Sequence, residues 1–166
     1  MINAGVSPKK VTLLPVGLDG IDTVPVSAQE AGDARREFGC LPGAVVFLYP
    51  GAARSIRGID ALLGAFPLVT ERSPDAFLVL LARGSDITHC EDLLATCRRR
   101  GIGERVTVIG GWLSRGRLAA SIDARDVVVL PFVLAPSDVP IAVLEAMARG
   151  KPVISSPVDG IPELVQ

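Results

Sequence analysis

Short aliphatic runs alternate along the chain with segments in which apolar residues recur every three or four positions. The run at residues 44–49 (AVVFLY) is apolar throughout, and residues 58–70 carry apolar side chains at helical spacing. Continuous apolar runs are typical of strands buried on both faces, and the wider spacing is typical of helices. The pattern predicts further strands at residues 76–82, 105–109, 126–131 and 152–155, and further helices at residues 88–100, 114–121 and 140–149.

This alternation of strands with helices predicts an α/β fold, an open parallel sheet with helices on both faces. Residues 20–40 show the least regular pattern, with a short helix expected near residues 31–38. Gly64 and Pro67 fall inside the helix predicted at residues 58–70, which we therefore expect to be weak or kinked.

Composition limits the classes of partner. The 166 residues are 49% hydrophobic and only 4% aromatic, which suits one domain with an aliphatic core. The formal net charge is -1, so no nucleic acid partner is expected, and the run of arginines at residues 98–100 suits a helix end.

The cysteines and the hydropathy of the chain indicate in which cellular compartment the protein is expected. The three cysteines lack metal or redox spacing, which fits the cytoplasm, and Cys90 and Cys97 share one helix face as expected core residues. No apolar run reaches the roughly 18 residues that a transmembrane segment needs. Peripheral membrane contact through another domain stays open.

Glycine and arginine follow the strand predicted at residues 44–49. Ligands of open parallel sheets bind outside the carboxyl ends of the strands, so the segment 51–58 (GAARSIRG) is a candidate site. Gly51 allows a ligand to approach the backbone closely. Arg57 stands where a helix begins, a place that disfavours a cation unless an anion binds beside it. The segment therefore indicates phosphate recognition, with Arg54 as a second candidate or a plain surface residue.

A helix start follows the strand predicted at residues 126–131. Ser137 and Asp138 are good N-cap residues, and Pro140 suits a first turn, whose free amides form a natural seat for phosphate. Glu145 lies about two turns further on, and its carboxylate can accept two hydrogen bonds from a cis-diol such as ribose. By themselves these residues predict an α/β domain that binds a phosphate-bearing ligand, without naming a reaction.

The stretch at residues 136–165 (PSDVPIAVLEAMARGKPVISSPVDGIPELV) resembles the donor-site signature of the group 1 retaining glycosyltransferases, whose GT-B fold has two Rossmann-like domains. Weaker matches fall in the same order at residues 14–19 (LPVGLD), 49–60 (YPGAARSIRGID) and 108–112 (VIGGW). The resemblance implies the C-terminal, donor-nucleotide-binding half of such an enzyme. Because both ends of the chain look incomplete, we expect a fragment that lacks the N-terminal acceptor domain and the final C-terminal helices.

The resemblance also implies roles for matching residues. Glu145 matches a glutamate that binds the nucleotide ribose, and Arg57 matches a lysine that binds the diphosphate and serves catalysis. Glycines of the family's site loops are matched at Gly51, Gly84 and Gly110. The turn whose backbone faces the sugar and the diphosphate is matched by Val139, Pro140 and Ile141.

Three positions depart from the family's pattern. Ser137 stands where the family has a catalytic glutamate, which contacts hydroxyls of the donor sugar. Asp138 is one residue away. Ala52 stands where the family has an arginine, although Arg54 is near, and Val16 stands where the family has an asparagine. Nucleotide binding is therefore predicted more firmly than any particular sugar.

The implied reaction moves a sugar from a nucleoside diphosphate to an acceptor hydroxyl with retention of anomeric configuration. No metal or other cofactor is expected, because Arg57, Arg54 and a helix N-terminus would neutralise the leaving diphosphate. The acceptor, a glycan, lipid or small molecule, would bind the missing domain, so the isolated chain is expected to bind nucleotide and transfer nothing. His89 is expected to lie far from the site, in a structural or surface role.

Two other functions stay open. A related sugar-nucleotide epimerase needs carboxylates or a histidine placed for proton abstraction, and the sequence reveals no such set. A non-catalytic α/β interaction module with a degenerate nucleotide site is favoured by Ser137, which replaces the first glutamate.

Overall fold

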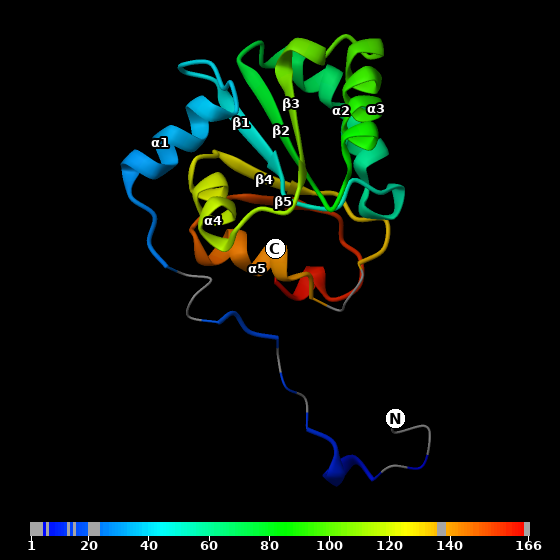
Figure 1. The fold of residues 1–166 in the computed structure, drawn as a ribbon. Coiled ribbons are helices and arrows are strands. Elements are labelled where there is room, and N and C mark those ends of the chain that lie inside the picture. The colour runs from blue at the N-terminus through cyan, green and yellow to red at the C-terminus, as the bar shows by residue number, and fades with distance from the viewer. Residues whose placement is uncertain are drawn as a thin grey trace.

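The computed structural model describes residues 5, 7–12, 14, 16–19, 24–135 and 139–164. Its sheet consists of β1 (Val45–Tyr49), β2 (Ala76–Arg83), β3 (Val106–Gly111), β4 (Val127–Leu130) and β5 (Val153–Ser155). All neighbouring strands are parallel, in the order β3-β2-β1-β4-β5 (Figure 1). The α-helices are α1 (Ala28–Glu37), α2 (Ile59–Arg72), α3 (Ile87–Arg99), α4 (Arg115–Asp123) and α5 (Ile141–Ala148), and short 3-10 helices are η2 (Pro8–Lys10), η4 (Ser55–Arg57), η5 (Gly103–Arg105) and η6 (Ile161–Glu163).

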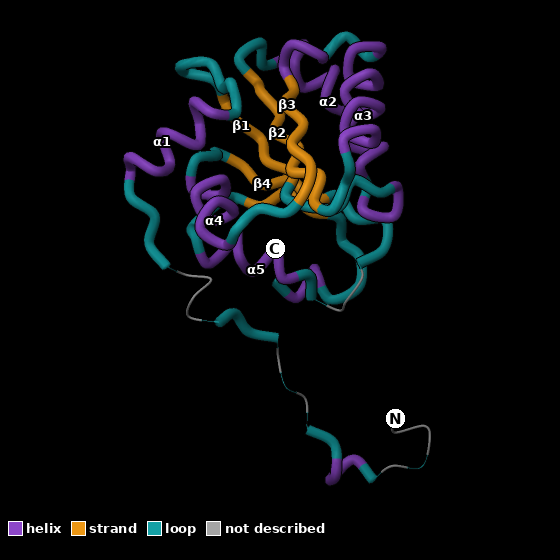
Figure 2. The backbone as a smooth tube through the Cα atoms, in the orientation of Figure 1, coloured by secondary structure: helices purple, strands orange, loops and turns teal. Residues whose placement is uncertain are grey.

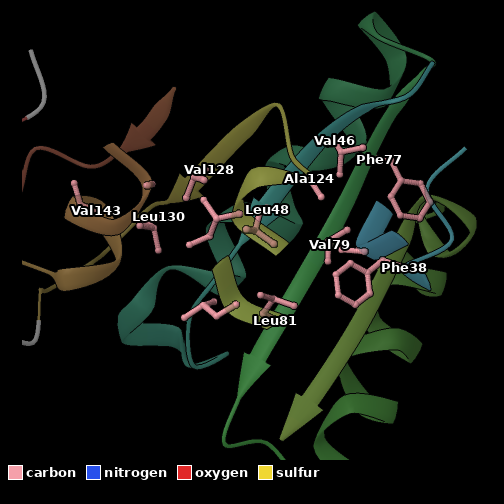
Figure 3. Close-up of a cluster of buried hydrophobic side chains, with 14 of the residues drawn as sticks. Phe38, Val46, Leu48, Phe77, Val79, Leu81, Ala124, Val128, Leu130 and Val143 are labelled. Atoms are coloured by element: carbon pink, nitrogen blue, oxygen red, sulfur yellow. The ribbon is translucent and has the colours of Figure 1, made fainter. Parts of the chain in front are cut away.

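Helices cover both faces of the sheet, as the alternating pattern predicts. One core cluster joins α1, α4 and α5 to a face that includes Val46, Leu48 and Val128 (Figure 3). The second joins α2 and α3 to the opposite face through residues such as Leu78 and Leu80. Every residue of β2 except its last is buried, which is why the sequence there is continuously apolar.

The predicted elements are confirmed, with ends shifted by one to three residues. α2 runs without interruption through Gly64 and Pro67 over 14 residues, and its apolar face is buried. Cys97 is buried in the core beside the partly buried Cys90, as their spacing predicts. α3 ends at Arg99, so the arginine run does lie at a helix end.

The short helix expected near residues 31–38 begins earlier than predicted. α1 begins at Ala28, three residues before the predicted start, because Ser27 and Glu30 form a capping box. Before it, the described residues of the apolar run at 11–16 are in no strand, and Leu14 is 83% exposed. Residues 7–12 and 16–19 lie apart from the sheet (Figure 2). Within the described residues, no helix has the length and apolar character to cross a membrane.

The strand order places a topological switch point between β1 and β4. The chain moves outward from β1 through β2 to β3, then returns to the other side of β1 with β4 and β5. Open α/β sheets bind ligands at the carboxyl edge beside such a switch point.

Candidate functional site

Two adjoining hollows lie at the carboxyl ends of the strands. The first lobe, about 320 Å³, is lined by Pro50, Gly51, Ala52, Arg57, Arg83, Trp112, Pro140, Ile141 and Ala142. The second lobe, about 660 Å³, is lined by Ala52, Ala53, Arg54, Ile56, Arg57, Arg83, Gly84, Ser85, Asp86, His89 and Trp112. Four residues line both lobes, so together they form one cleft that reaches from the start of α5 to the start of α3.

The loop after β1 is held by the buried side chain of Tyr49. Its hydroxyl donates to the carbonyl oxygen of Ala52 at 2.8 Å and lies 3.4 Å from that of Arg57. Burial raises the pKa of Tyr49 well above its usual value, although the nearby Arg57 opposes the rise. The phenol therefore remains a neutral donor, and it fixes the backbone that carries the candidate arginines.

The loops after β1 and β4 are joined directly at the switch point. Gly58 has a φ of +78°, and a Cβ atom there would lie 1.6 Å from the carbonyl oxygen of Pro131. The carbonyl oxygen of Ile56 accepts hydrogen bonds from the amides of Val133 and Leu134, at 3.1 and 3.2 Å. Only glycine satisfies both the backbone angle and the close approach at position 58.

Positive charge lies along the cleft, with Arg57 lining both lobes and Arg54 lining the second. Arg57 is partly buried, with its Cζ atom 5.8 Å from the centroid of the Phe132 ring, and the exposed Arg54 directly precedes η4. Pro140 is the N-cap of α5, and Ile141 begins the helix. First-turn amides have no acceptor within their own helix, so they and the arginine favour an anion here. Gly51, Arg57, Pro140 and Ile141 are thus brought together as predicted.

The second lobe combines an aromatic face with a carboxylate. Trp112 is 77% exposed, and the Cζ atom of Arg83 lies 5.5 Å from its ring centroid. Asp86 caps α3 through a hydrogen bond from the amide of His89 at 2.8 Å. Gly84 lines this lobe, where a Cβ atom on it would lie 3.3 Å from the tryptophan ring.

The expectation that His89 lies far from the site is wrong. Its side chain lines the second lobe, where Nε2 lies 3.0 Å from the carbonyl oxygen of Ala53 and therefore carries the proton. His89 lies in α3, which follows β2. Because β1 and β2 are parallel, the start of α3 lies at the same edge of the sheet as the loop after β1. The contact joins α3 to that loop, so the histidine has a structural role inside the cleft.

Several other predicted residues lie outside the lining of the cleft. Glu145 is partly buried in the second turn of α5, and Val139 is partly buried just before that helix. Gly110 stands behind the cleft wall, where a Cβ atom would lie 2.5 Å from Cys90 Sγ and 2.9 Å from the carbonyl oxygen of Ser85. Its small size thus serves packing. Ser137, with Asp138, lies outside the described residues.

The sequence places Arg83 and Trp112 in segments that follow strands, at residues 83–85 and 110–113, where ligands bind, but it predicts no role for either side chain. Trp112 appears in the sequence only as the aromatic residue after a strand, and Arg83 as the last residue of another. The structure pairs Arg83 with Gly111 across neighbouring strands, which places the arginine beside the tryptophan. Only the strand register brings them together. Among the described residues, no three His, Cys, Asp or Glu side chains gather as metal ligands.

Comparison with known proteins decides the family. The family model for glycosyl transferases group 1 matches residues 44–166, which is most of the chain. The chain belongs to the group 1 glycosyltransferases. An uncharacterised glycosyltransferase of Methanocaldococcus jannaschii is 32% identical over 143 residues, covering 86% of this chain and 35% of its own length. A D-inositol 3-phosphate glycosyltransferase of Actinosynnema mirum is 30% identical over 168 residues, covering 96% of this chain and 38% of its own.

Solved glycosyltransferases share the fold. The Anabaena protein HepE, solved in complex with UDP and glucose, has a TM-score of 0.77 at 23% identity and covers 99% of this chain and 43% of its own. The C-terminal domain of the group 1 protein LpcC from Francisella tularensis has a TM-score of 0.71 at 21% identity, covering 90% of this chain and 75% of its own. This glycosyltransferase chain thus spans little more than a third of its curated relatives and has the Rossmann-like fold of a C-terminal GT-B domain.

Proposed function

We propose that this glycosyltransferase chain binds the nucleoside-diphosphate sugar donor and that the whole enzyme transfers the sugar to an acceptor with retention of configuration. The observation that carries the proposal is the first lobe, where Arg57 and Gly51 face the N-terminus of α5 across the switch point. A diphosphate seated there would meet a cation, open backbone and a helix dipole together.

In the proposed reaction, Arg57 and the start of α5 bind the diphosphate leaving group. Negative charge grows on that group as the bond to the sugar breaks, and fixed positive charge around it stabilises the transition state. Arg54, which borders the second lobe, adds to the same field. Glu145 holds the ribose, and the backbone at Val139 faces the sugar. Both roles rest on the match to the family's motif.

The relatives support the donor part of the proposal. HepE was solved with UDP and glucose, and its fold superposes on nearly the whole of this chain. Several curated relatives are D-inositol 3-phosphate glycosyltransferases, whose names describe sugar transfer. The acceptor, a glycan, lipid or small molecule, would contact the part of the enzyme that this chain does not span.

Ligand-detected NMR of UDP, GDP, ADP and CDP with the chain tests donor binding. At least one nucleotide is expected to bind in the micromolar to millimolar range, roughly -8 to -4 kcal/mol. Arg57→Ala is expected to weaken binding about tenfold or more, because it removes a charge-assisted contact. Glu145→Ala is expected to weaken it similarly.

Arg72→Ala and Glu71→Ala serve as matched controls, because both residues are exposed at the far end of α2 and line neither lobe. Equal affinity for all four variants and the unchanged chain would contradict the proposed site. Sugar transfer by residues 1–166 alone would contradict the assignment of the acceptor to another part of the enzyme.

We also propose that donor binding needs no metal ion, because arginine and a helix N-terminus supply the positive charge. Nucleotide affinity is expected to be the same in EDTA and in millimolar Mg²⁺. A clear loss of affinity in EDTA would show that a cation bridges the diphosphate to the protein.

A further inference from the structure

The second lobe is lined by the ring of Trp112, which is not packed into the core. Trp112 is 77% exposed, although the domain has few aromatic residues. Its ring is nevertheless held in place. Arg83 lies over it, with Cζ 5.5 Å from the centroid, and a Cβ atom on Gly84 would lie 3.3 Å from its Cζ2 atom. An exposed but positioned ring is suited to stacking on a planar ligand.

A carboxylate stands in the same lobe. Asp86 lines it, and one of its oxygen atoms, Oδ1, accepts the amide hydrogen of His89 at 2.8 Å. That hydrogen bond orients the side chain at the start of α3. An ionised carboxylate only accepts hydrogen bonds, so it favours a ligand edge that presents donors.

The common nucleobases differ in the edge they present. Guanine offers two adjacent donors, N1–H and the exocyclic N2 amine, which match one carboxylate. Uracil offers a single N3–H between two carbonyl oxygens, and these oxygens repel a carboxylate. Adenine and cytosine offer one amine beside an unprotonated ring nitrogen. Guanine is also the larger stacking surface.

We propose that the second lobe selects guanine, with Trp112 stacking on the base and Asp86 accepting from its N1–H and N2 amine. The inference rests on the proposed donor function, in which the diphosphate occupies the adjoining first lobe. It separates this chain from HepE, which was solved with UDP. The donor would then be a GDP-sugar.

Affinities of GDP, UDP, ADP and CDP, measured by titration calorimetry or NMR, test the inference. GDP is expected to bind at least about tenfold more tightly than UDP, because a well-placed pair of hydrogen bonds to a base discriminates by about that factor or more. Asp86→Asn is expected to bring the affinity for GDP down to that for UDP and to leave UDP unchanged. Asparagine is an equally good N-cap, so α3 is preserved.

Asp92→Asn, on the exposed side of the same helix and outside both lobes, is the matched control and is expected to keep the preference for GDP. Trp112→Ala is expected to weaken all four nucleotides by a similar factor. Because the ring is exposed, its loss leaves the core intact.

The outcomes separate the inference from the function on which it rests. UDP binding as tightly as GDP, or a GDP preference that survives Asp86→Asn, would overturn the guanine assignment while leaving donor binding in place. No detectable binding of any of the four at millimolar concentration would overturn the proposed function as well.

Discussion

Arginines stack on aromatic rings at both ends of the sheet, but under opposite conditions. At the carboxyl end, Arg57 lies over Phe132 and Arg83 over Trp112, and both line the cleft. At the amino end, Arg125 lies over Phe38, 4.6 Å from the centroid, and is only 1% exposed. The same local contact therefore lies in an open cleft at one end and is sealed into the fold at the other.

The buried arginine is incompletely paired. Its Nη1 atom donates to the carbonyl oxygen of Ala124 at 3.2 Å, while Nε and Nη2 have no hydrogen-bond partner. Arg35 donates to the same carbonyl oxygen at 3.0 Å and also pairs with Asp126 at 3.3 Å. Burial lowers the pKa of Arg125 to about 10, and the neighbouring Arg35 adds to this effect. A buried guanidinium with two unpaired nitrogen atoms thus costs stability at the amino end of the sheet.

The largest effect is expected from Gly58→Ala at the carboxyl end. The new Cβ atom would meet the carbonyl oxygen of Pro131 at 1.6 Å, so the loops after β1 and β4 must separate. We expect a loss of roughly 4 kcal/mol in the free energy of unfolding, measured by urea denaturation. Gly150→Ala is the control, because its φ is also positive at +65° but nothing lies within 4 Å, so it should cost only about 1 kcal/mol. Equal losses would mean that the close approach is unimportant.

A smaller effect of opposite sign is expected at the amino end. Arg125→Met replaces a buried, partly unpaired charge with an apolar chain of similar length, and it is expected to raise the free energy of unfolding by about 1 kcal/mol. Arg35→Met is the matched control, because it breaks hydrogen bonds and an ion pair and is expected to lose about 2 kcal/mol. Destabilisation by Arg125→Met would show that its stack on Phe38 outweighs its burial.

The stability gained by Arg125→Met is expected to depend on pH, in a direction that the lowered pKa of Arg125 determines. The pKa of Arg125 is about 10 in the folded chain, below its ordinary value in the unfolded chain, so the unfolded chain binds more protons from about pH 10 up to that ordinary value. Stability linked to this group therefore rises with pH through that window, and the penalty is complete below it. The advantage of Arg125→Met is expected to be constant from pH 7 to 9 and to shrink towards pH 11. An advantage that grows with pH would contradict a lowered pKa.

The smallest effect is expected from Tyr49→Phe, which removes the hydroxyl that donates to Ala52. A loss of about 0.5 kcal/mol is expected from one hydrogen bond. Nucleotide affinity should fall at the same time, because the loop carrying Arg57 is less well held. Unchanged affinity would show that other contacts suffice to hold that loop.

Much of the fold was predictable because strands that are buried on both faces, such as β2, appear in the sequence as continuous apolar runs. The start of α1 was missed although Ser27 and Glu30 form a recognisable capping box in the sequence. The loops after β1 and before α5 were found because glycine, arginine and proline have local meanings at strand and helix ends. Trp112 and Arg83 fell in candidate segments after strands but were given no role, because their meeting depends on the register between β2 and β3, which no local pattern encodes.

The shared carbonyl oxygen of Ile56 has a consequence for how a ligand binds. Because the amides of Val133 and Leu134 both donate to it, the segments after β1 and β4 are joined by backbone hydrogen bonds in addition to the contact of Arg57 with Phe132. This part of the crevice is already ordered in the folded chain, so little of the entropy lost on binding falls on it. The two amides should be protected from hydrogen exchange before any nucleotide is added, and a donor would meet a surface whose shape folding has already set.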